Sequence, residues 1–238
     1  MSAASLPTIQ TLWIGEELTT MERLCAESFI QNGHDFHIYT YGDLRNTPRG
    51  IELKDAASII PPEKIFKYKD HNSYAGFSNI FRYKLLRDRG NVWVDFDVIC
   101  LRPFDSDADY FFSGVLKEDE SRTDDAQVTG MAGQLKTLLG RWSIFLAPSR
   151  YQRVGSCVIK APRNSEIMEY CYRESLKPDP SQLTWGQIGP KLITRAIARF
   201  DMWRHVEPPE TFAPIKPWDW KNIINGNIDI SALQHSRS

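Results

Sequence analysis

The sequence lacks an apolar run of the roughly 18–20 residues that a membrane-spanning helix requires. It also lacks an excess of charge of either sign, because 29 Lys and Arg nearly balance 30 Asp and Glu and leave a net charge of −1. A neutral chain has no overall electrostatic field to attract DNA, RNA or an acidic membrane surface. We therefore expect no transmembrane segment and no nucleic-acid partner.

Cysteines are few, and no pair of them forms a C-x-x-C motif. The first residues lack both the basic segment and the apolar segment of a secretory signal. Widely spaced cysteines without a pairing pattern are typical of free, mostly buried thiols in a reducing compartment, and they argue against structural zinc. We therefore predict a cytoplasmic protein. The four cysteines are Cys25, Cys100, Cys157 and Cys171.

The 238 residues are 42% hydrophobic, which is enough for one substantial core. Neither an internal repeat nor a low-complexity tract divides the chain. The tail beyond residue 207 contains four prolines and two tryptophans, a composition too rigid and aromatic for a disordered linker. We expect one domain over residues 1–238, with the tail folded back on it.

The N-terminal region follows a strand–helix–strand pattern. Residues 8–14 are apolar and β-branched, which predicts a strand. Thr19 and Glu22 form a capping box for a helix that should end near Asn32-Gly33, and residues 34–41 predict a second strand. This order indicates an α/β fold with a mostly parallel sheet. The predicted apolar face of the helix consists of Met21, Leu24, Cys25 and Ser28.

Farther along, residues 42–75 are polar and contain prolines, so we expect loops and short helical turns. Phe77, Ile80, Phe81 and Leu85 lie on one face of an amphipathic helix that should end at Gly90. The other predicted segments are a strand from residue 91, loops over residues 105–140, a strand over 154–160, a helix over 165–176, a turn over 185–190 and a helix ending near residue 200.

Two acids follow the apolar run Val92-Trp93-Val94. A run of this kind is typical of a strand buried on both faces, and unpaired buried carboxylates are costly, so the strand should end at about Asp95. Ligands bind at the carboxyl edge of such sheets. Side chains two apart on an extended chain point the same way, so Asp95 and Asp97 would address one site. Their oxygens suit Mn²⁺ or Mg²⁺. The alternative is an acidic turn paired with Arg82 or Arg102.

The segment from Phe77 to Val98 resembles the sugar-binding region with D-x-D motif of glycosyltransferase family 32. This family includes α-1,4-galactosyltransferases and mannosyltransferases. Trp13-Ile14-Gly15 is similar to the family's opening strand, and the stretch from Trp185 to Thr194 resembles its W-G-x-x-G-P-x-L-x-T segment. The resemblance implies a GT-A fold, a Rossmann-like α/β sandwich. Residues 8–105 would be the nucleotide-sugar-binding half, and residues 106–238 the acceptor-side half and tail.

The resemblance also implies roles for individual residues. Trp13 would lie against the nucleotide base, with Ile14 and Gly15 shaping its pocket. Asp95 would contact the donor and, through water, the metal, whereas Asp97 would bind the metal directly. The residues implied at the donor's sugar, ribose or diphosphate are Ser78, Asn79 and Arg82, and Gly189 and Pro190 would shape the donor or acceptor pocket.

Three departures from the family pattern stand out. Asn79 replaces a common Asp, and Asn91 replaces the second glycine of a Gly-Gly pair, which Asn can do because it tolerates the left-handed conformation. The third metal ligand of such sites is often a His near the C-terminus, and here His235 is the candidate, without the usual aromatic residue behind it. Trp218 and Trp220 are candidates either for an acceptor platform or for core packing.

The implied function is a metal-dependent retaining glycosyltransferase in polysaccharide biosynthesis. It would move a hexose from a UDP- or GDP-sugar to a glycan or lipid-linked acceptor, and a peripheral position at the membrane is compatible with this role. Two alternatives remain. One is a nucleotide-sugar-binding protein without catalysis. The other is a phosphatase, because Asp95-Phe96-Asp97-Val98 also resembles the haloacid-dehalogenase motif, in which the first Asp is the nucleophile.

Overall fold

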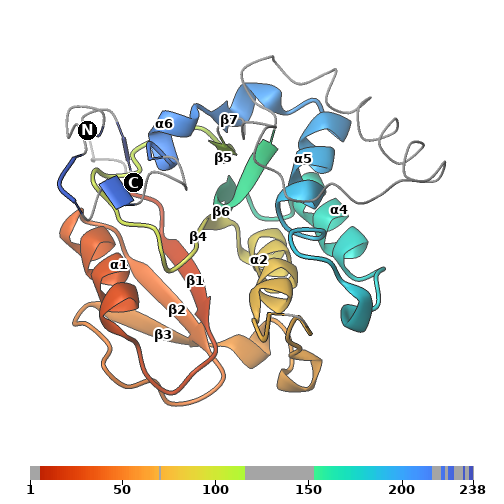
Figure 1. Ribbon diagram of the computed structural model, residues 1–238, viewed down its shortest axis with the longest axis horizontal. Helices are drawn as coiled ribbons and strands as arrows, with labels where there is room; N and C mark the ends of the chain where they lie inside the picture. The colour runs from red at the N-terminus through yellow and green to blue at the C-terminus, as the bar shows by residue number, and fades with distance from the viewer. Residues whose placement is uncertain are drawn as a thin grey trace.

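The computed structural model describes residues 6–69, 71–115, 153–215, 221–222, 225–227, 233 and 236–237. Their centre is a seven-stranded sheet of order β3-β2-β1-β4-β6-β5-β7 (Figure 1). The strands are β1 (Ile9–Trp13), β2 (Phe36–Thr40), β3 (Ile51–Asp55), β4 (Asn91–Val94), β5 (Phe111–Val115), β6 (Arg153–Ala161) and β7 (Val206–Glu207).

Four of the strand pairings in this sheet are parallel, and the two that involve β6 are antiparallel. The predicted α/β fold with a mostly parallel central sheet is therefore confirmed. The helices are α1 (Thr20–Gln31), α2 (Ala75–Arg89), α4 (Glu166–Ser175), α5 (Pro190–Arg199) and α6 (Pro209–Phe212). Short 3₁₀ turns cover Ala56–Ser58, Pro62–Lys64, Pro180–Gln182 and Trp203–His205.

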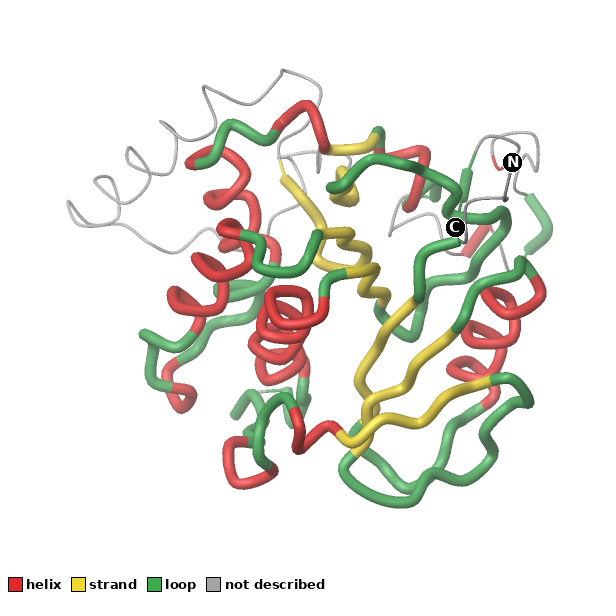
Figure 2. Tube along the Cα trace, turned by 180° about the vertical axis from the view of Figure 1, so that it is seen from behind, coloured by secondary structure: helices red, strands yellow, loops and turns green. Residues whose placement is uncertain are grey.

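Helices cover both faces of the sheet and create two apolar cores. Figure 2 shows α1 on one side of the strands and α2, α4 and α5 on the other. Successive residues of β4 point to opposite faces: Val92 and Val94 belong to the core under α1, and Trp93 belongs to the core under α2. This explains the uninterrupted apolar run of β4. Within the described ranges, no helix combines the length and apolarity needed to cross a bilayer.

The capping box at Thr19 and Glu22 and the helix end at Asn32 are confirmed. The predicted buried face of α1 is only partly correct. Met21 and Leu24 are each 53% exposed, whereas Cys25 and Phe29 are fully buried. The helix is rotated by about one residue from the predicted orientation, because Phe29 reaches a cluster of aromatic rings beneath the sheet.

Two strands lie where loops were predicted. β3 has mostly exposed side chains and contains Glu52 and Lys54, so its polar composition concealed an edge strand. β5 lies within the predicted loop of residues 105–140, of which residues 116–140 are outside the described part. The prediction for residues 154–160 is confirmed by β6, and the predictions for 165–176 and for the helix ending near 200 are confirmed by α4 and α5. All four cysteines are free thiols, and three of them are buried.

The link between α2 and β4 depends on two left-handed residues. Gly90 has φ 70° and Asn91 has φ 73°. A Cβ atom at Gly90 would lie 2.6 Å from the backbone nitrogen of Arg163, so only glycine fits there. Asn91 takes up the left-handed conformation that Asn tolerates better than most residues. This tight link sets α2 antiparallel to β4 and places the N-terminal half of α2 at the carboxyl edge of the sheet.

Candidate active site

The acidic segment begins where β4 ends. Val94 is the last residue of the strand, and the backbone N–H of Asp95 still donates to the carbonyl of Cys157 on β6 (2.8 Å). Phe96 and Asp97 then form a turn, closed by a bond from the Val98 N–H to the Asp95 carbonyl (3.2 Å). The predicted strand end at Asp95 is confirmed. The prediction that both acids lie on one extended segment is wrong, because the chain turns between them.

The Asp95 carboxylate is held through one of its two oxygens. Its Oδ1 accepts from Nη2 of Arg82 (2.7 Å) and from Nε1 of Trp93 (2.8 Å). Burial raises the pKa of the Asp95 carboxyl and the negative charge of Asp97 adds to the rise, while Arg82 and Trp93 act in the opposite direction. Among the described residues, none donates to Oδ2. Oδ2 therefore keeps acceptor capacity that the described residues do not use.

Arg82 is 3% exposed and acts as the fixed support of Asp95. Its Nη1 donates to the carbonyl of Ser156 on β6, and its Nη2 also contacts Oγ of Ser78 (3.3 Å). The guanidinium lies 4.8 Å from the centre of the Trp93 ring, an arrangement that favours a cation–π interaction. Arg82 therefore connects α2, β4 and β6 at a single point.

Asp97 is exposed, and within the described residues it has no hydrogen-bond or ion-pair partner. The alternative of an acidic turn neutralised by arginine therefore describes only half of the segment. Asp95 is paired with Arg82, whereas the described contacts include none between Arg102 and either acid. The turn presents one carboxylate that is fixed and one that is open to solvent.

A divalent cation fits this arrangement. The exposed Asp97 carboxylate and the Oδ2 of Asp95 both offer oxygen acceptors, and Mg²⁺ is commonly bound by one or two carboxylates together with water and substrate phosphates. Within the part of the chain that is described, no group of three or more His, Cys, Asp or Glu side chains gathers to hold an ion. The proposed third ligand, His235, lies outside the described residues, as do Trp218 and Trp220.

The end of β1 lies beside the acidic turn. The Trp13 ring meets Phe96 edge to face (centroids 5.5 Å apart, 81°), and its Nε1 donates to the carbonyl of Glu17 (3.0 Å). A Cβ atom at Gly15 would lie 2.9 Å from that Nε1, so the indole lies across the glycine. Trp13 is half-buried, and its contact with Phe96 connects the end of β1 to the acidic turn.

Ile14 and Gly15 line a pocket of about 630 Å³ beside this tryptophan. The prediction did not include its opposite wall, which follows β2. β1 and β2 are parallel neighbours with Trp13 opposite Thr40, so the chain after both strands must leave the sheet at the same edge. The parallel pairing of β1 and β2 was therefore the signal that could have predicted this second wall. The other lining residues are Glu16, Thr40, Tyr41, Gly42, Asp43 and Arg45.

Asn79 is buried in the first turns of α2, where Gly189 lies directly against it. Its Nδ2 donates to the carbonyl of Ala75 (2.9 Å), and its Oδ1 has no hydrogen-bond partner among the described residues. A neutral amide suits this position, because an unpaired carboxylate would be costly there. The hydroxyl of Tyr83 donates to the carbonyl of Ile188 (3.0 Å), which fixes the segment that contains Gly189.

We expect Gly189→Ala to destabilise the protein by about 1–3 kcal/mol, the usual cost of overpacking. A Cβ atom at Gly189 would lie 2.9 Å from Nδ2 of Asn79, and α5 begins at the next residue, Pro190. Urea unfolding measures the change. Gly42→Ala is the control, since a Cβ atom there meets nothing within 4 Å. Equal stability of the two variants would contradict the close contact.

The structure thus joins three stretches that are far apart in the sequence. Ser78, Arg82, Asp95 and Asp97 form the centre, with Trp13 attached through Phe96. Asn79 connects this centre to Gly189 and Pro190 at the start of α5. The carboxyl edge of the sheet therefore combines a pocket, an open carboxylate and buried polar groups that have unused bonding capacity.

The sequence matches no protein-family model, and no curated protein matches it. Solved structures give three similarities. A PaToxG glycosyltransferase is 12% identical, with 82% of this chain and 70% of that chain covered and a TM-score of 0.49. An active-site mutant of LgtC is 13% identical, with 96% and 82% covered and a TM-score of 0.48. The galactosyltransferase LgtC in complex with donor and acceptor sugar analogues is 12% identical, with 94% and 81% covered and a TM-score of 0.48. At this level of similarity, function has to be inferred from the site itself.

Proposed function

We propose that this chain is a metal-dependent retaining glycosyltransferase of the GT-A type, which moves a hexose from a UDP- or GDP-sugar to a hydroxyl of a glycan or lipid-linked acceptor. The observation that carries the proposal is the acidic turn after β4. Arg82 fixes Asp95 there, and Asp97 stays exposed without a partner among the described residues. The pocket after β1 and β2 lies at the same edge, combines apolar surface with polar side chains, and suits a nucleoside.

Different residues at this edge of the sheet would contact different parts of the donor. Ile14 and Gly15, with the residues that follow β2, would hold the nucleoside, and Trp13 would border the base. Asp97 would bind Mn²⁺ or Mg²⁺ directly, and Asp95 would support the ion through water and contact the donor. When bound, the ion would stabilise the negative charge of the departing diphosphate. The retaining stereochemistry is carried over from the resemblance to family 32.

The sugar of the donor would lie over the N-terminal half of α2. Ser78 is half-buried there, and its hydroxyl already contacts Arg82. The Oδ1 of Asn79 is buried against Gly189 and has no hydrogen-bond donor among the described residues, so it would be an acceptor for a sugar hydroxyl once the Gly189 segment moves aside. Removing a hydroxyl-binding group from such a site would weaken discrimination between hexoses.

The test is turnover of UDP-galactose, UDP-glucose and GDP-mannose by the purified protein with Mn²⁺, with Mg²⁺ or with EDTA. We expect hydrolysis or transfer with at least one donor, and a loss of about 10²-fold or more in EDTA, because the charge of the leaving diphosphate would then be unscreened. If none of the three donors is turned over and none binds, the proposal is wrong.

Donor binding and phosphatase measurements beside this assay separate the two alternatives. Metal-dependent binding of a donor without any turnover would indicate a nucleotide-sugar-binding protein that lacks catalysis. Hydrolysis of p-nitrophenyl phosphate without hydrolysis of nucleotide-sugars would indicate a phosphatase that uses Asp95 as its nucleophile. Asp95→Asn would abolish that phosphatase activity.

A further inference from the structure

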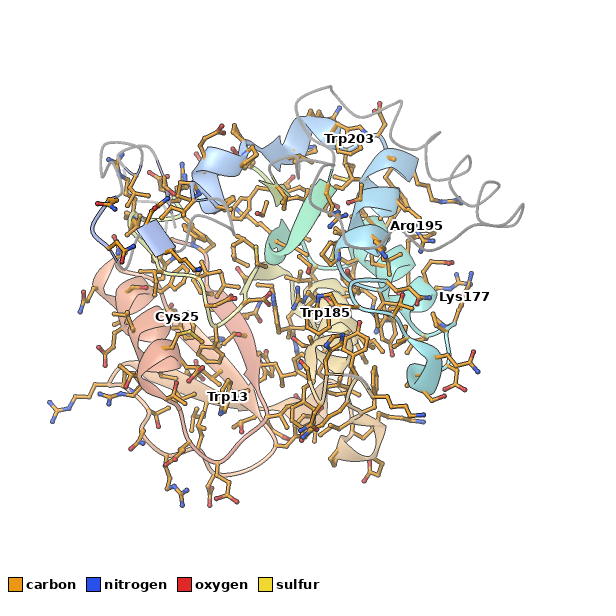
Figure 3. All side chains as sticks on the ribbon, viewed as in Figure 1. Trp13, Cys25, Lys177, Trp185, Arg195 and Trp203 are labelled. Atoms are coloured by element: carbon orange, nitrogen blue, oxygen red, sulfur yellow. The ribbon has the colours of Figure 1, made fainter. Side chains whose placement is uncertain are left out.

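Three aromatic rings gather outside the site just described. Trp185 precedes α5, and Tyr68 and His71 precede α2. The Trp185 ring lies 5.2 Å from that of Tyr68 and 4.8 Å from that of His71, measured between centroids, and the Tyr68 and His71 rings are 6.4 Å apart. We call these three residues the aromatic shelf. Figure 3 shows Trp185 in front of α2.

The base of the aromatic shelf is rigid. Tyr68 is 2% exposed, and its ring would lie 3.1 Å from a Cβ atom placed at Gly76, so it packs directly on the first turn of α2. Residues Tyr68 and Ser73 also form a β-bridge that closes the loop containing His71. The shelf is therefore attached to the same helix end that places Ser78 and Asn79 at the donor.

The top of the aromatic shelf is open. Trp185 is 54% exposed, whereas Trp93 and Trp203 in the cores are 1% and 8% exposed. Gly186, the next residue, has φ 72°, a left-handed turn that a larger side chain rarely adopts. The chain thus uses a glycine turn to hold a large aromatic ring toward solvent, supported from one side by Tyr68 and His71. Core packing alone does not require that exposure.

The chemistry of this surface suits a sugar ring. The C–H groups on the apolar face of a pyranose carry partial positive charge and are attracted to the negative face of an aromatic ring. Sugar hydroxyls also need polar partners nearby. His71 is exposed, and Gln187 accepts through its Oε1 from the backbone and hydroxyl of Thr184 (both 3.1 Å), while its amide N–H groups have no acceptor among the residues that the structure describes.

The aromatic shelf lies close in the chain to the residues proposed to contact the donor's sugar. The segment that begins at Trp185 reaches Gly189, which contacts Asn79 one helical turn before Arg82. One short loop therefore runs from the shelf to the proposed position of the donor's sugar. We propose that the aromatic shelf binds a pyranose ring of the carbohydrate acceptor and presents one of its hydroxyls toward the donor. This inference rests on the proposed function for the acceptor role, and on the shelf alone for sugar binding.

Saturation-transfer NMR without any donor tests the sugar binding. The probes are methyl β-D-galactopyranoside, methyl β-D-glucopyranoside and methyl α-D-mannopyranoside at millimolar concentration. We expect saturation of the ring protons on the apolar face of at least one probe. Trp185→Ala should reduce this signal about tenfold, whereas Trp185→Phe should retain most of it because a ring is still present. Met21→Ala is the control, since Met21 on α1 is also 53% exposed.

The outcomes separate this inference from the proposed function. If no probe is saturated, or if Trp185→Ala keeps the full signal, the aromatic shelf does not bind sugar. Saturation of adenosine or tyrosine amide in place of all three sugars would assign the shelf to another ring system and overturn the proposal. With an active donor, Trp185→Ala should raise KM for the acceptor about tenfold and leave donor hydrolysis unchanged. An equal loss of donor hydrolysis would contradict an acceptor role, even if transferase activity itself is present.

Discussion

Asp97→Asn is expected to lower kcat/KM for the nucleotide-sugar by about 10²–10³-fold, the range found when one group that stabilises a developing negative charge is removed. Asp97 is exposed and has no partner among the described residues, so the neutral amide should change the free energy of unfolding by no more than about 0.5 kcal/mol. Donor hydrolysis in Mn²⁺, measured beside urea unfolding, checks both expectations.

Asp107→Asn provides the matched control for this substitution. Asp107 is also an exposed acid after β4, but its charge acts on Lys160, which pairs with Val92 near the start of β4. It should retain the hydrolysis rate of the unchanged protein. If Asp97→Asn hydrolyses the donor as fast as Asp107→Asn does, the exposed carboxylate of the acidic turn has no role in catalysis.

The second large effect concerns stability. Arg82→Met should lower the free energy of unfolding by about 3 kcal/mol, because breaking a buried ion pair leaves an uncompensated charge. Arg82 is 3% exposed and bonds to Asp95, Ser78 and Ser156, so its removal also leaves the Ser156 carbonyl without that donor. Urea unfolding followed by tryptophan fluorescence measures the change.

A surface ion pair supplies the control. Arg23 pairs with Glu27 on α1 at 3.6 Å, and both side chains are more than 40% exposed. Arg23→Met should therefore cost no more than about 1 kcal/mol. In the double variant Arg82→Met with Asp95→Asn, part of the lost stability should return, because the unpaired charge is gone. Equal costs for Arg82→Met and Arg23→Met would show that Arg82 does not support Asp95.

The link from α2 to β4 was predicted well because its signals are local. The apolar spacing from Phe77 to Leu85 defines a helix face, and all four residues of that pattern are buried. Gly90 marks the end of the helix, and the apolar run after it can only be a covered strand. Each of these signals depends on neighbours within a few residues.

Elements that depend on the rest of the fold were predicted poorly. The rotation of α1 could not be read from the sequence, because Met21 and Leu24 on one side and Ala26 and Phe29 on the other are all apolar. The aromatic cluster under the sheet decides between them. β3 is a strand because β2 offers an edge to pair with, as in Phe36 opposite Ile51, and its own composition is too polar to show it.

In the candidate site, too, the features that depend on neighbouring residues were predicted, and those that depend on distant residues were not. The end of β4 just before Asp95 followed from the cost of burying a carboxylate. The turn at Phe96 and Asp97 did not, because the prediction treated the two-residue spacing as that of an extended chain. The contact between Asn79 and Gly189 joins residues 110 positions apart, which no local pattern encodes. His235 lies outside the described residues, so its role as a metal ligand stays a prediction.

Isothermal titration of UDP and of GDP into the protein is the most direct test of the metal-dependent donor site. In Mn²⁺ we predict that one of the two nucleotides binds at least about tenfold more tightly than in EDTA, because the ion joins the acidic turn to the diphosphate. Asp97→Asn should remove that difference. If neither nucleotide binds, or if binding is equally tight in EDTA and in Asp97→Asn, the acidic turn after β4 is not a metal-dependent donor site.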